Sequence, residues 1–259
     1  MIQLKDQELL RRLPAIRRAR EFHLYDASGK RFLDMYLEGG LAWLGHRPEG
    51  LSLEIKNIVS RGVYAAYPGS EEGKLLKALT ALKAILPGSH GHTSIRYYRS
   101  AHSEVLPAAI DPLYQKEGSC MLWRPGLAWP LDAESVEMLI PLPGLEYGRL
   151  IASRDETLPP GDLPSALIAG ALTRCVWVLK KNLEGSVPFP PFIIPEGSPW
   201  TQQGPYCLWS GNAENYSTLF TEALELGILL SPSPDLPCIL PGIQTSGDLK
   251  LLKQFFGGL

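Results

Sequence analysis

The segment from Val187 to Pro205 constrains the fold more than any other part of the sequence, because prolines recur along its whole length. Each proline fixes φ and removes a backbone N–H donor, so the segment can be neither a regular helix nor a central strand. An ordered crossover tolerates such a stretch well. We therefore expect two lobes that are joined by residues 187–205.

Apolar periodicity and turn residues predict a mixed α/β chain around this crossover. Residues 22–35 have the pattern strand, glycine turn, strand, which predicts a β-hairpin. Ser70 is expected to cap a helix with an apolar stripe, which Pro87-Gly88 ends. The further expected elements are strands at 93–99, 120–123, 136–142, 149–152 and 206–209, a buried helix at 166–179, a helix ended by Gly227, and a terminal helix at 249–256.

Charge and hydropathy exclude several classes of function. The net charge of −2 provides no overall field to attract nucleic acid or an anionic membrane, so neither is an expected partner. The basic run from Arg11 to Arg20 has the spacing of a solvated helix face, with polyanion binding as the less favoured interpretation. No stretch approaches the ~18 to 20 apolar residues of a membrane span, and no apolar signal core is present, so a cytoplasmic protein is expected. The four widely spaced cysteines are expected to be reduced, mostly buried thiols.

Several segments match the motifs of one enzyme family, in order and in register. Residues 24–34 (LYDASGKRFLD) are similar to the hairpin motif "lyDvdGrryiD", and residues 44–48 (LGHRP) to "LGHxhP". Residues 95–109 occupy the place of "vrfvnSGtEAneaA". Near the C-terminus, residues 219–230 resemble a small-domain helix with its "eGvll" strand, and residues 240–245 resemble "laPplt". The chain thus resembles the class III pyridoxal-phosphate (PLP) aminotransferases, most closely the glutamate-semialdehyde aminomutase branch.

The resemblance implies an α/β fold of the fold-type I PLP-transferase kind, with a small α+β domain and a large sheet domain. We assign residues 1–90 and 206–259 to the small domain, 91–186 to a reduced large domain, and 187–205 to the crossover. Only residues 115–163 stand where the family has a far larger cofactor domain. A seven-stranded sheet does not fit this length, because each strand takes ~5 to 6 residues and each crossover helix a dozen or more.

The resemblance also implies which residues PLP chemistry would need, and two of them are missing. The family places its Schiff-base lysine some thirty residues before the helix that residues 166–179 resemble, yet no lysine occurs between Glu117 and Leu179. The acid that would protonate the pyridine nitrogen has no counterpart, since Asp155-Glu156 is followed by Thr157 and two prolines. The lysines outside this span, among them Lys83, are expected on polar helix faces with hydrated amines. We therefore predict no catalytic residue and no cofactor, or PLP if the family activity survives.

The phosphate-binding loop of the family has a weak counterpart in Ser100, Ala101, His102 and Ser103. Where the family has glycine, Ala101 hinders the approach of backbone amides to a phosphate, and Pro107 would stand in the first turns of the next helix. These four residues are candidate ligands only if a phosphate ligand is retained. His90-Gly91-His92 lacks acidic or cysteine partners nearby, so a plain loop is favoured over a metal site.

Three functions remain open on this sequence. The first is a non-catalytic, aminotransferase-like protein that binds a partner, either as a homodimer or with an intact aminotransferase relative. The apolar residues 37–43 motivate the homodimer, because exposed they would invite aggregation. The second is an enzyme of altered chemistry that binds PLP or another phosphate ligand. The third is a remnant whose fold persists without a selected task.

Overall fold

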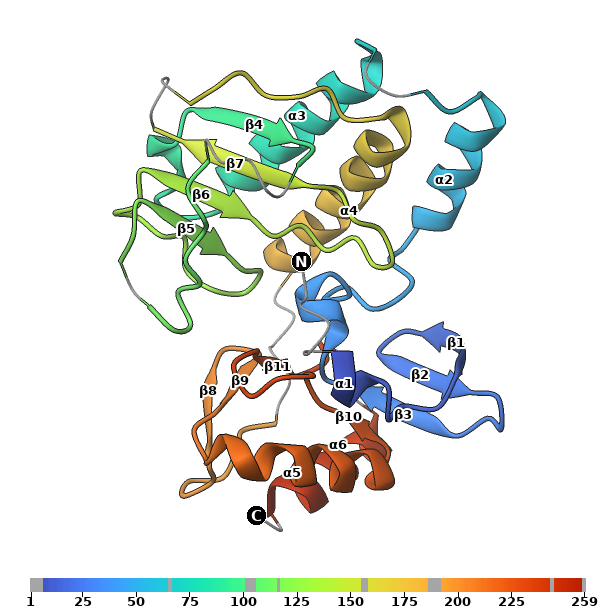
Figure 1. Cartoon of the computed structure of the whole chain (residues 1–259). Coiled ribbons are helices and arrows are strands. Elements are labelled where there is room, and N and C mark those ends of the chain that lie inside the picture. The colour runs from blue at the N-terminus through green and yellow to red at the C-terminus, as the bar shows by residue number, and fades with distance from the viewer. Residues whose placement is uncertain are drawn as a thin grey trace. The chain divides into compact units, whose positions relative to one another are not determined.

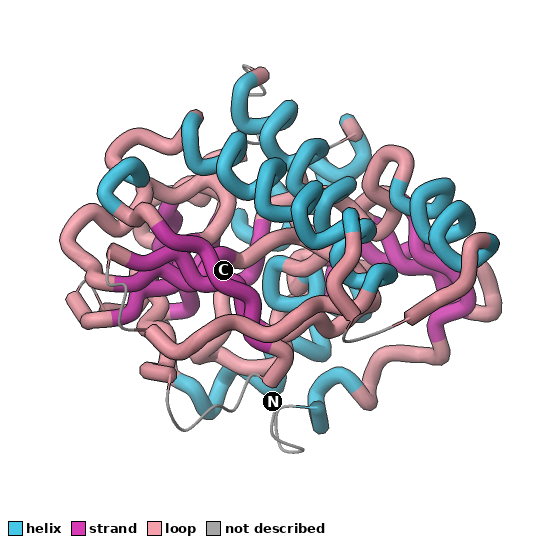
Figure 2. Tube along the Cα trace, turned by 90° about the horizontal axis from the view of Figure 1, so that it is seen from above, coloured by secondary structure: helices cyan, strands magenta, loops and turns pink. Residues whose placement is uncertain are grey.

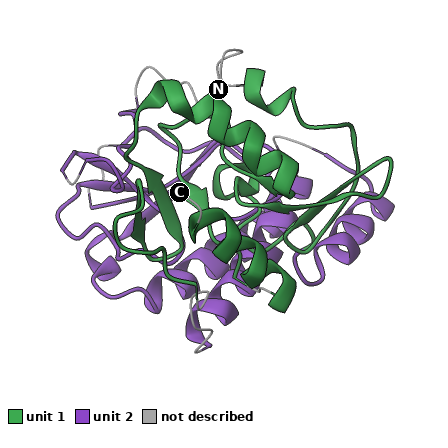
Figure 3. Cartoon of the chain, turned by 90° about the horizontal axis from the view of Figure 1, so that it is seen from below, with its two compact units in different colours: residues 1–47, 187–259 green, residues 48–186 purple. Residues whose placement is uncertain are grey.

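The computed structural model describes residues 7–64, 67–100, 106–115, 117–154, 158–185, 192–242 and 245–257. The chain forms two compact units, residues 1–47 with 187–259 and residues 48–186 (Figure 3). The first boundary follows residue 47, whereas the sequence placed it near residue 90. The reason is that the two helices between these positions pack with the helix that closes the second unit. We describe each unit by itself.

Unit 1, residues 1–47 and 187–259, contains two small sheets. In the first, the strand order is β1-β2-β3-β10, with β1 (Ile16–Arg20), β2 (His23–Asp26), β3 (Arg31–Asp34) and β10 (Ile228–Leu229). The predicted hairpin is confirmed, since β2 and β3 pair antiparallel, and β10 adds to β3 in parallel. The second sheet has the order β11-β9-β8, formed by β8 (Trp200–Gln203), β9 (Tyr206–Trp209) and β11 (Cys238–Ile239). β8 is an edge strand, which fits its proline-rich surroundings.

The helices of unit 1 are α1 (Gln7–Leu10), α5 (Ala213–Leu226) and α6 (Ser246–Gly257), with a 3-10 turn η1 (Leu37–Gly40). The predicted helix before Gly227 is confirmed as α5, whose Asn212 side chain accepts a hydrogen bond from Glu214 N and whose end is the left-handed Gly227. A single buried cluster joins the strands to these helices, and its largest side chains include Phe32, Trp200, Tyr216, Phe220 and Phe256. Cys207 and Cys238 lie in this core as free thiols, and Cys120 and Cys175 are free and buried in unit 2, as predicted.

In the described part of unit 2, residues 48–186, the chain forms one four-stranded sheet and three helices. The strands are β4 (Ser94–Tyr98), β5 (Cys120–Trp123), β6 (Ser135–Met138) and β7 (Arg149–Ser153), in the order β4-β7-β6-β5. All four were predicted from short apolar runs. The helices are α2 (Leu51–Ser60), α3 (Ser70–Ala84) and α4 (Ala166–Glu184), with a 3-10 turn η2 (Ser89–Gly91). Figure 1 shows α3 and α4 side by side against the sheet, and Figure 2 shows how much of the chain between the elements is loop.

The predicted buried helix is confirmed as α4. It carries a buried face that includes Leu172, Cys175, Val176 and Leu179, and the Ser165 hydroxyl accepts a hydrogen bond from Ile168 N at its start. The two faces of the sheet differ in character. Strand residues such as Ile95, Tyr97 and Leu150 meet α3, while the opposite face carries polar groups, among them the Ser135 hydroxyl, which lies 3.1 Å from the Ser153 hydroxyl. None of the helices in the described ranges is long and apolar enough to cross a membrane.

Three sequence interpretations are wrong in detail. The basic run does not lie on a helix face: Arg17, Arg18 and Arg20 belong to the strand β1, all of whose residues are exposed. No helix follows Pro107, because the described residues 106–118 are irregular except for a bridge between Ile110 and Met121 beside β5. The apolar stretch 37–43 is not an open patch within unit 1, since Leu37 and Ala42 are both 0% exposed. The large apolar side chains that are exposed near one another in sequence lie instead at 59–67.

Candidate functional site: the carboxyl edge of the unit 2 sheet

Three strands of unit 2 end at the same edge of the sheet. β5 runs parallel to β6, and both β4 and β6 run antiparallel to β7, so β4, β5 and β6 share one direction. In open α/β sheets, ligands bind outside the carboxyl ends of such strands. Ser100 follows β4, Arg124 follows β5, and the connection to β7 follows β6. This edge is therefore the place to look for a site.

The predicted phosphate-loop residues begin at this edge. Ser100 is exposed at the end of β4, and Ala101, His102 and Ser103 lie outside the described residues. The amide before Ser100 already has a partner from within the chain: Arg99 N donates to Asp162 Oδ2 at 2.8 Å, and Asp162 N donates to Tyr97 O at 2.7 Å. The Asp162 carboxylate competes with a phosphate for the Arg99 amide, and its negative charge repels the phosphate.

The connection from β6 to β7, residues 139–148, lies within the span from Glu117 to Leu179 that contains no lysine. Tyr147 is buried inside it, and its hydroxyl accepts a 2.8 Å hydrogen bond from Ile140 N; burial raises the pKa of Tyr147 well above its usual range. Gly148 has φ +81°, and a Cβ there would lie 2.2 Å from Tyr98 O and 2.8 Å from Arg99 O. The connection is thus packed closely against the end of β4.

Two arginines at this edge are engaged in ion pairs with carboxylates of the same unit. Arg124 Nε and Nη2 donate to Asp111 Oδ2 at 2.8 and 2.5 Å. Arg149 Nε donates to Glu137 Oε2 at 2.7 Å, and its Nη2 donates to Pro107 O at 2.7 Å. Both arginines are buried. The sequence analysis missed both pairs, and no local pattern marks them, because each partner lies twelve or thirteen residues away.

Two further sequence candidates have structural roles in unit 2. Trp129 Nε1 donates to His92 Nδ1 at 3.2 Å, which leaves His92 Nε2 to donate to Ala133 O at 2.9 Å. Both ring nitrogens are thus used, and burial lowers the pKa of His92, which agrees with a loop and not a metal site. No group of three His, Cys, Asp or Glu in the described ranges is placed to hold a metal ion.

The expectation that the lysine amines are hydrated is wrong for Lys83. This side chain is buried, it donates to His92 O, and burial lowers its pKa.

Comparison with solved structures identifies the architecture. Ornithine δ-aminotransferase of Plasmodium falciparum superposes with a TM-score of 0.70 over 94% of this chain and 92% of that chain, at 11% identity. Acetylornithine aminotransferase of Elizabethkingia anophelis gives 0.66 over 95% and 94%, at 12% identity. The fold is that of the fold-type I PLP transferases. At these identities the similarity concerns the fold alone.

Sequence comparison places the chain beside two spirochaete proteins of similar length. It is 26% identical to an uncharacterized protein of Treponema pallidum over 92% of both chains, and 28% identical to an uncharacterized protein of Borreliella burgdorferi over 96% of this chain and 92% of the relative. No protein-family model matches the chain.

Several residues of this PLP-transferase fold differ from those that PLP needs. The span from Glu117 to Leu179, in which the resemblance places the lysine, contains none, and Asp162 takes the amide next to the phosphate-loop position. Lys83, the buried lysine of unit 2, is held by the carbonyl of a buried histidine and lines no described pocket. These residues do not fit a covalently bound PLP.

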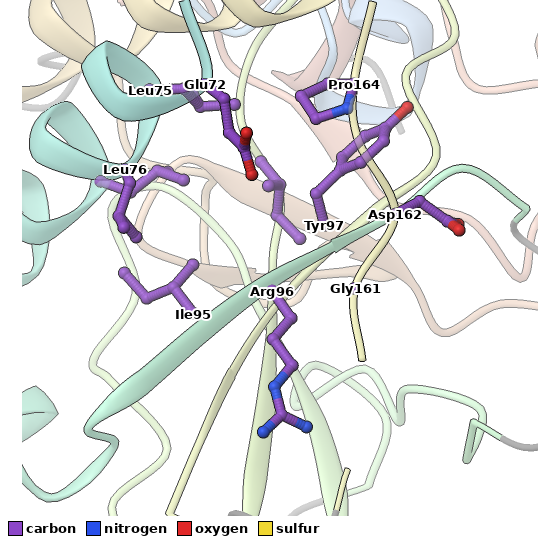
Figure 4. Close-up of a pocket in the computed structure, with 11 residues that line it drawn as sticks. Glu72, Leu75, Leu76, Ile95, Arg96, Tyr97, Gly161, Asp162 and Pro164 are labelled. Carbon is purple, nitrogen blue, oxygen red and sulfur yellow. The ribbon is translucent and has the colours of Figure 1, made fainter. Parts of the chain in front are cut away.

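A small pocket of the PLP-transferase fold lies elsewhere in unit 2, between α3 and the outer edge of β4 (Figure 4). Its volume is about 190 Å³. Apolar side chains line most of it, and Glu72 contributes a carboxylate. The other lining residues are Leu75, Leu76, Leu79, Ile95, Arg96, Tyr97, Leu150, Gly161, Asp162 and Pro164. The sequence predicts the elements that carry most of these residues, but not that they meet at one pocket.

In unit 1, a buried polar cluster surrounds a turn of unusual backbone. Asp34 Oδ1 accepts from Tyr36 N and Leu37 N, both at 2.9 Å, and Asp34 Oδ2 pairs with His46 Nε2 at 2.9 Å. His46 Nδ1 lies 3.5 Å from Glu38 Oε1. Burial opposes a charge on His46, but the two carboxylates outweigh it and raise the pKa of His46 to about 9. Leu37 and Glu38 both have positive φ, so the cluster holds a strained turn in place.

Proposed function

We propose that this chain is a non-catalytic, shortened form of the aminotransferase architecture that binds a partner and does not transaminate. The observation that carries the proposal is the lysine-free connection between β6 and β7, which Tyr147 fills and Gly148 closes. Transamination needs an amine that anchors the cofactor and moves a proton. Within the described residues the sheet of unit 2 has four strands, fewer than the seven that the resemblance implies, which supports the proposed shortening.

The test is to add PLP, reduce with borohydride and map the products by mass spectrometry. We expect scattered, substoichiometric labelling of surface lysines and no transaminase activity with any amino donor. A Lys83→Ala variant serves as a matched control, because Lys83 is the buried lysine whose lowered pKa would make its amine the most nucleophilic. A single stoichiometric phosphopyridoxyl-lysine, lost on replacement of that lysine, would overturn the proposal and favour an enzyme of altered chemistry.

The partner role includes association with a second copy of the chain or with an intact aminotransferase. Leu37 and Ala42 are buried within unit 1, and the exposed apolar side chains at Val59, Val63 and Tyr67 support a homodimer instead. Sedimentation of the purified protein at tens of micromolar, roughly where weak interfaces associate, is expected to show a dimer. A Val63→Ser, Tyr67→Ser variant should shift the protein toward monomer. If the wild-type protein is still a monomer at tens of micromolar, the proposed homodimer is wrong.

The alternative of a retained phosphate ligand rests on Ser100, which stands at the end of β4 where the fold places ligands. Against it, Asp162 occupies the neighbouring Arg99 amide. The Asp162→Asn variant tests whether this carboxylate blocks a phosphate at Ser100. If the wild-type protein binds inorganic phosphate in a titration and Asp162→Asn does not bind it more tightly, the carboxylate does not block the site, and the result supports a retained phosphate ligand.

A further inference from the structure

The outer edge of β4 offers backbone groups to a further strand. β4 is an edge strand of the unit 2 sheet. Tyr97 O accepts from Asp162 N and Arg99 N donates to Asp162 Oδ2, so the backbone groups of Tyr97 and Arg99 point to the outer side. Backbone direction alternates along a strand, so those of Ile95 point outward too. Within the described ranges, residues 158–163 cover the edge at Tyr97, and no hydrogen bond meets Ile95 on this side.

The pocket described above adjoins this open stretch. Ile95 forms part of its wall, together with Leu76, whose side chain is 49% exposed, and Leu79. A volume of about 190 Å³ is smaller than the ~300–1,000 Å³ of pockets for drug-sized ligands, so one aliphatic side chain is a better match than a whole small molecule. An open edge beside an apolar pocket is the arrangement by which proteins capture extended peptides.

The charge at the pocket defines the occupant further. Figure 4 shows the carboxylate of Glu72 directed from α3 toward β4. Glu72 is exposed and makes no ion pair or hydrogen bond with another described residue, and Arg96 is turned away, since its guanidinium donates to Leu158 O and Pro159 O. The Asp162 carboxylate accepts from Arg99 N and is directed away from the pocket (Figure 4). The exposed carboxylate of Glu72 therefore favours a basic partner.

We propose that the open edge of β4 at Ile95 and the adjoining pocket bind an extended peptide segment that carries an aliphatic residue and, two positions away, a lysine or arginine. The spacing follows from geometry, because side chains two residues apart lie on the same face of a strand, ~7 Å apart. The aliphatic side chain enters the pocket and the basic side chain reaches Glu72. This inference names a ligand for the proposed binding role and rests on that role, but not on the fate of PLP.

The probe is the capped peptide acetyl-Thr-Val-Thr-Lys-Thr-amide, titrated into the whole chain while backbone amides are followed by NMR. We expect saturable binding up to millimolar concentration, with slower hydrogen exchange at the Ile95 amide. An analogue with Glu in place of Lys should bind more weakly. The variant Glu72→Lys should reverse the preference between the two peptides, and Glu72→Gln should weaken the Lys peptide about two- to fivefold, the range for an exposed ion pair.

Glu222→Gln is the matched control, because Glu222 is an exposed glutamate on a helix of unit 1 and should leave binding unchanged. No binding at millimolar peptide, equal affinity for the Lys and Glu peptides, or binding without protection at Ile95 would each overturn the inference. Protection of Ile95 that grows with protein concentration and without peptide would overturn it in favour of a second copy. A stoichiometric PLP adduct would refute the proposed function and leave these peptide results standing.

Discussion

The two units keep different parts of the PLP-transferase fold. In unit 1, residues that match the family motifs make specific contacts: Asp34 and His46 hold the turn after β3, and β10 pairs with β3. In unit 2, helices and strands remain, but the chain's own Tyr147 and Asp162 occupy the carboxyl edge where a ligand would bind. Packing is shared among many side chains and tolerates change, whereas a covalent cofactor depends on one lysine. The proposed function is a case of this kind, in which the fold is kept without the chemistry.

The largest expected difference between the units is the stability cost of replacing a glycine with positive φ in each. Gly148→Ala in unit 2 should cost roughly 4 kcal/mol or more, because its Cβ would lie 2.2 Å from Tyr98 O. Gly29→Ala in the unit 1 hairpin meets nothing within 4 Å and should cost only the left-handed strain of ~1–2 kcal/mol. Urea unfolding of both variants measures the difference. Similar losses would show that the carboxyl edge is loosely packed.

The second prediction concerns the pH dependence of unit 1. The pKa of His46 is raised from 6.5 to about 9, so its protonated form stabilises the folded chain fully below pH 6.5. That contribution, roughly 3 kcal/mol for a shift of this size, is lost as the pH rises through 9. His46→Gln should remove most of the decline in unfolding free energy between pH 6.5 and 9.5. An unchanged decline in the variant would assign it to other groups.

Two buried tyrosine hydroxyls give a matched pair with a smaller effect. Tyr147→Phe in unit 2 leaves Ile140 N without its acceptor, and Tyr216→Phe in unit 1 removes a 2.9 Å hydrogen bond to Ser231 O. Each should cost ~1–3 kcal/mol. Tyr147→Phe should be the larger, because the buried Ile140 N–H has a single hydrogen and loses its acceptor, whereas the Ser231 carbonyl loses one donor and has two lone pairs. Thermal unfolding monitored by calorimetry compares them. If Tyr147→Phe leaves the thermal stability unchanged, water already reaches the connection between β6 and β7.

The smallest effect has the opposite sign to that of His46. Burial lowers the pKa of Lys83 from 10.5, so between the folded and unfolded values the unfolded chain binds more protons and stability rises with pH. Lys83→Met should flatten this rise up to pH 10.5 while His46→Gln flattens the decline. Unfolding free energies of both single variants across pH 7–10 separate the two contributions. A steeper rise in Lys83→Met would contradict the assignment.

Most elements of the fold could be predicted, because their signals are local. The hairpin of residues 22–35 is marked by a glycine turn, and α5 by the apolar stripe that Gly227 ends. The basic run was misread as a helix face because Arg11–Arg20 is short enough for both periods to fit, although Pro14 within it argues against a helix.

The contacts at the candidate site could not be predicted. The sequence shows that no lysine lies between Glu117 and Leu179, but it does not show which side chains meet there. Asp162 meets Arg99 across 63 residues, and Lys83 is buried because the chain folds back so that the His92 carbonyl reaches its amine. Such pairings depend on the tertiary arrangement, so no window of sequence reveals them.

The exposed arginines of β1 have a consequence for the behaviour of the chain in crowded solution. β1 is the outer strand of its sheet, and Arg17, Arg18 and Arg20 are all exposed along it. Like charges on an outer strand repel a second identical strand, which disfavours the edge-to-edge strand pairing that leads to fibrils. Substitution of these arginines by threonine would leave the hairpin paired but remove that repulsion. The variant should then form thioflavin-positive aggregates at concentrations where the parent chain stays dispersed.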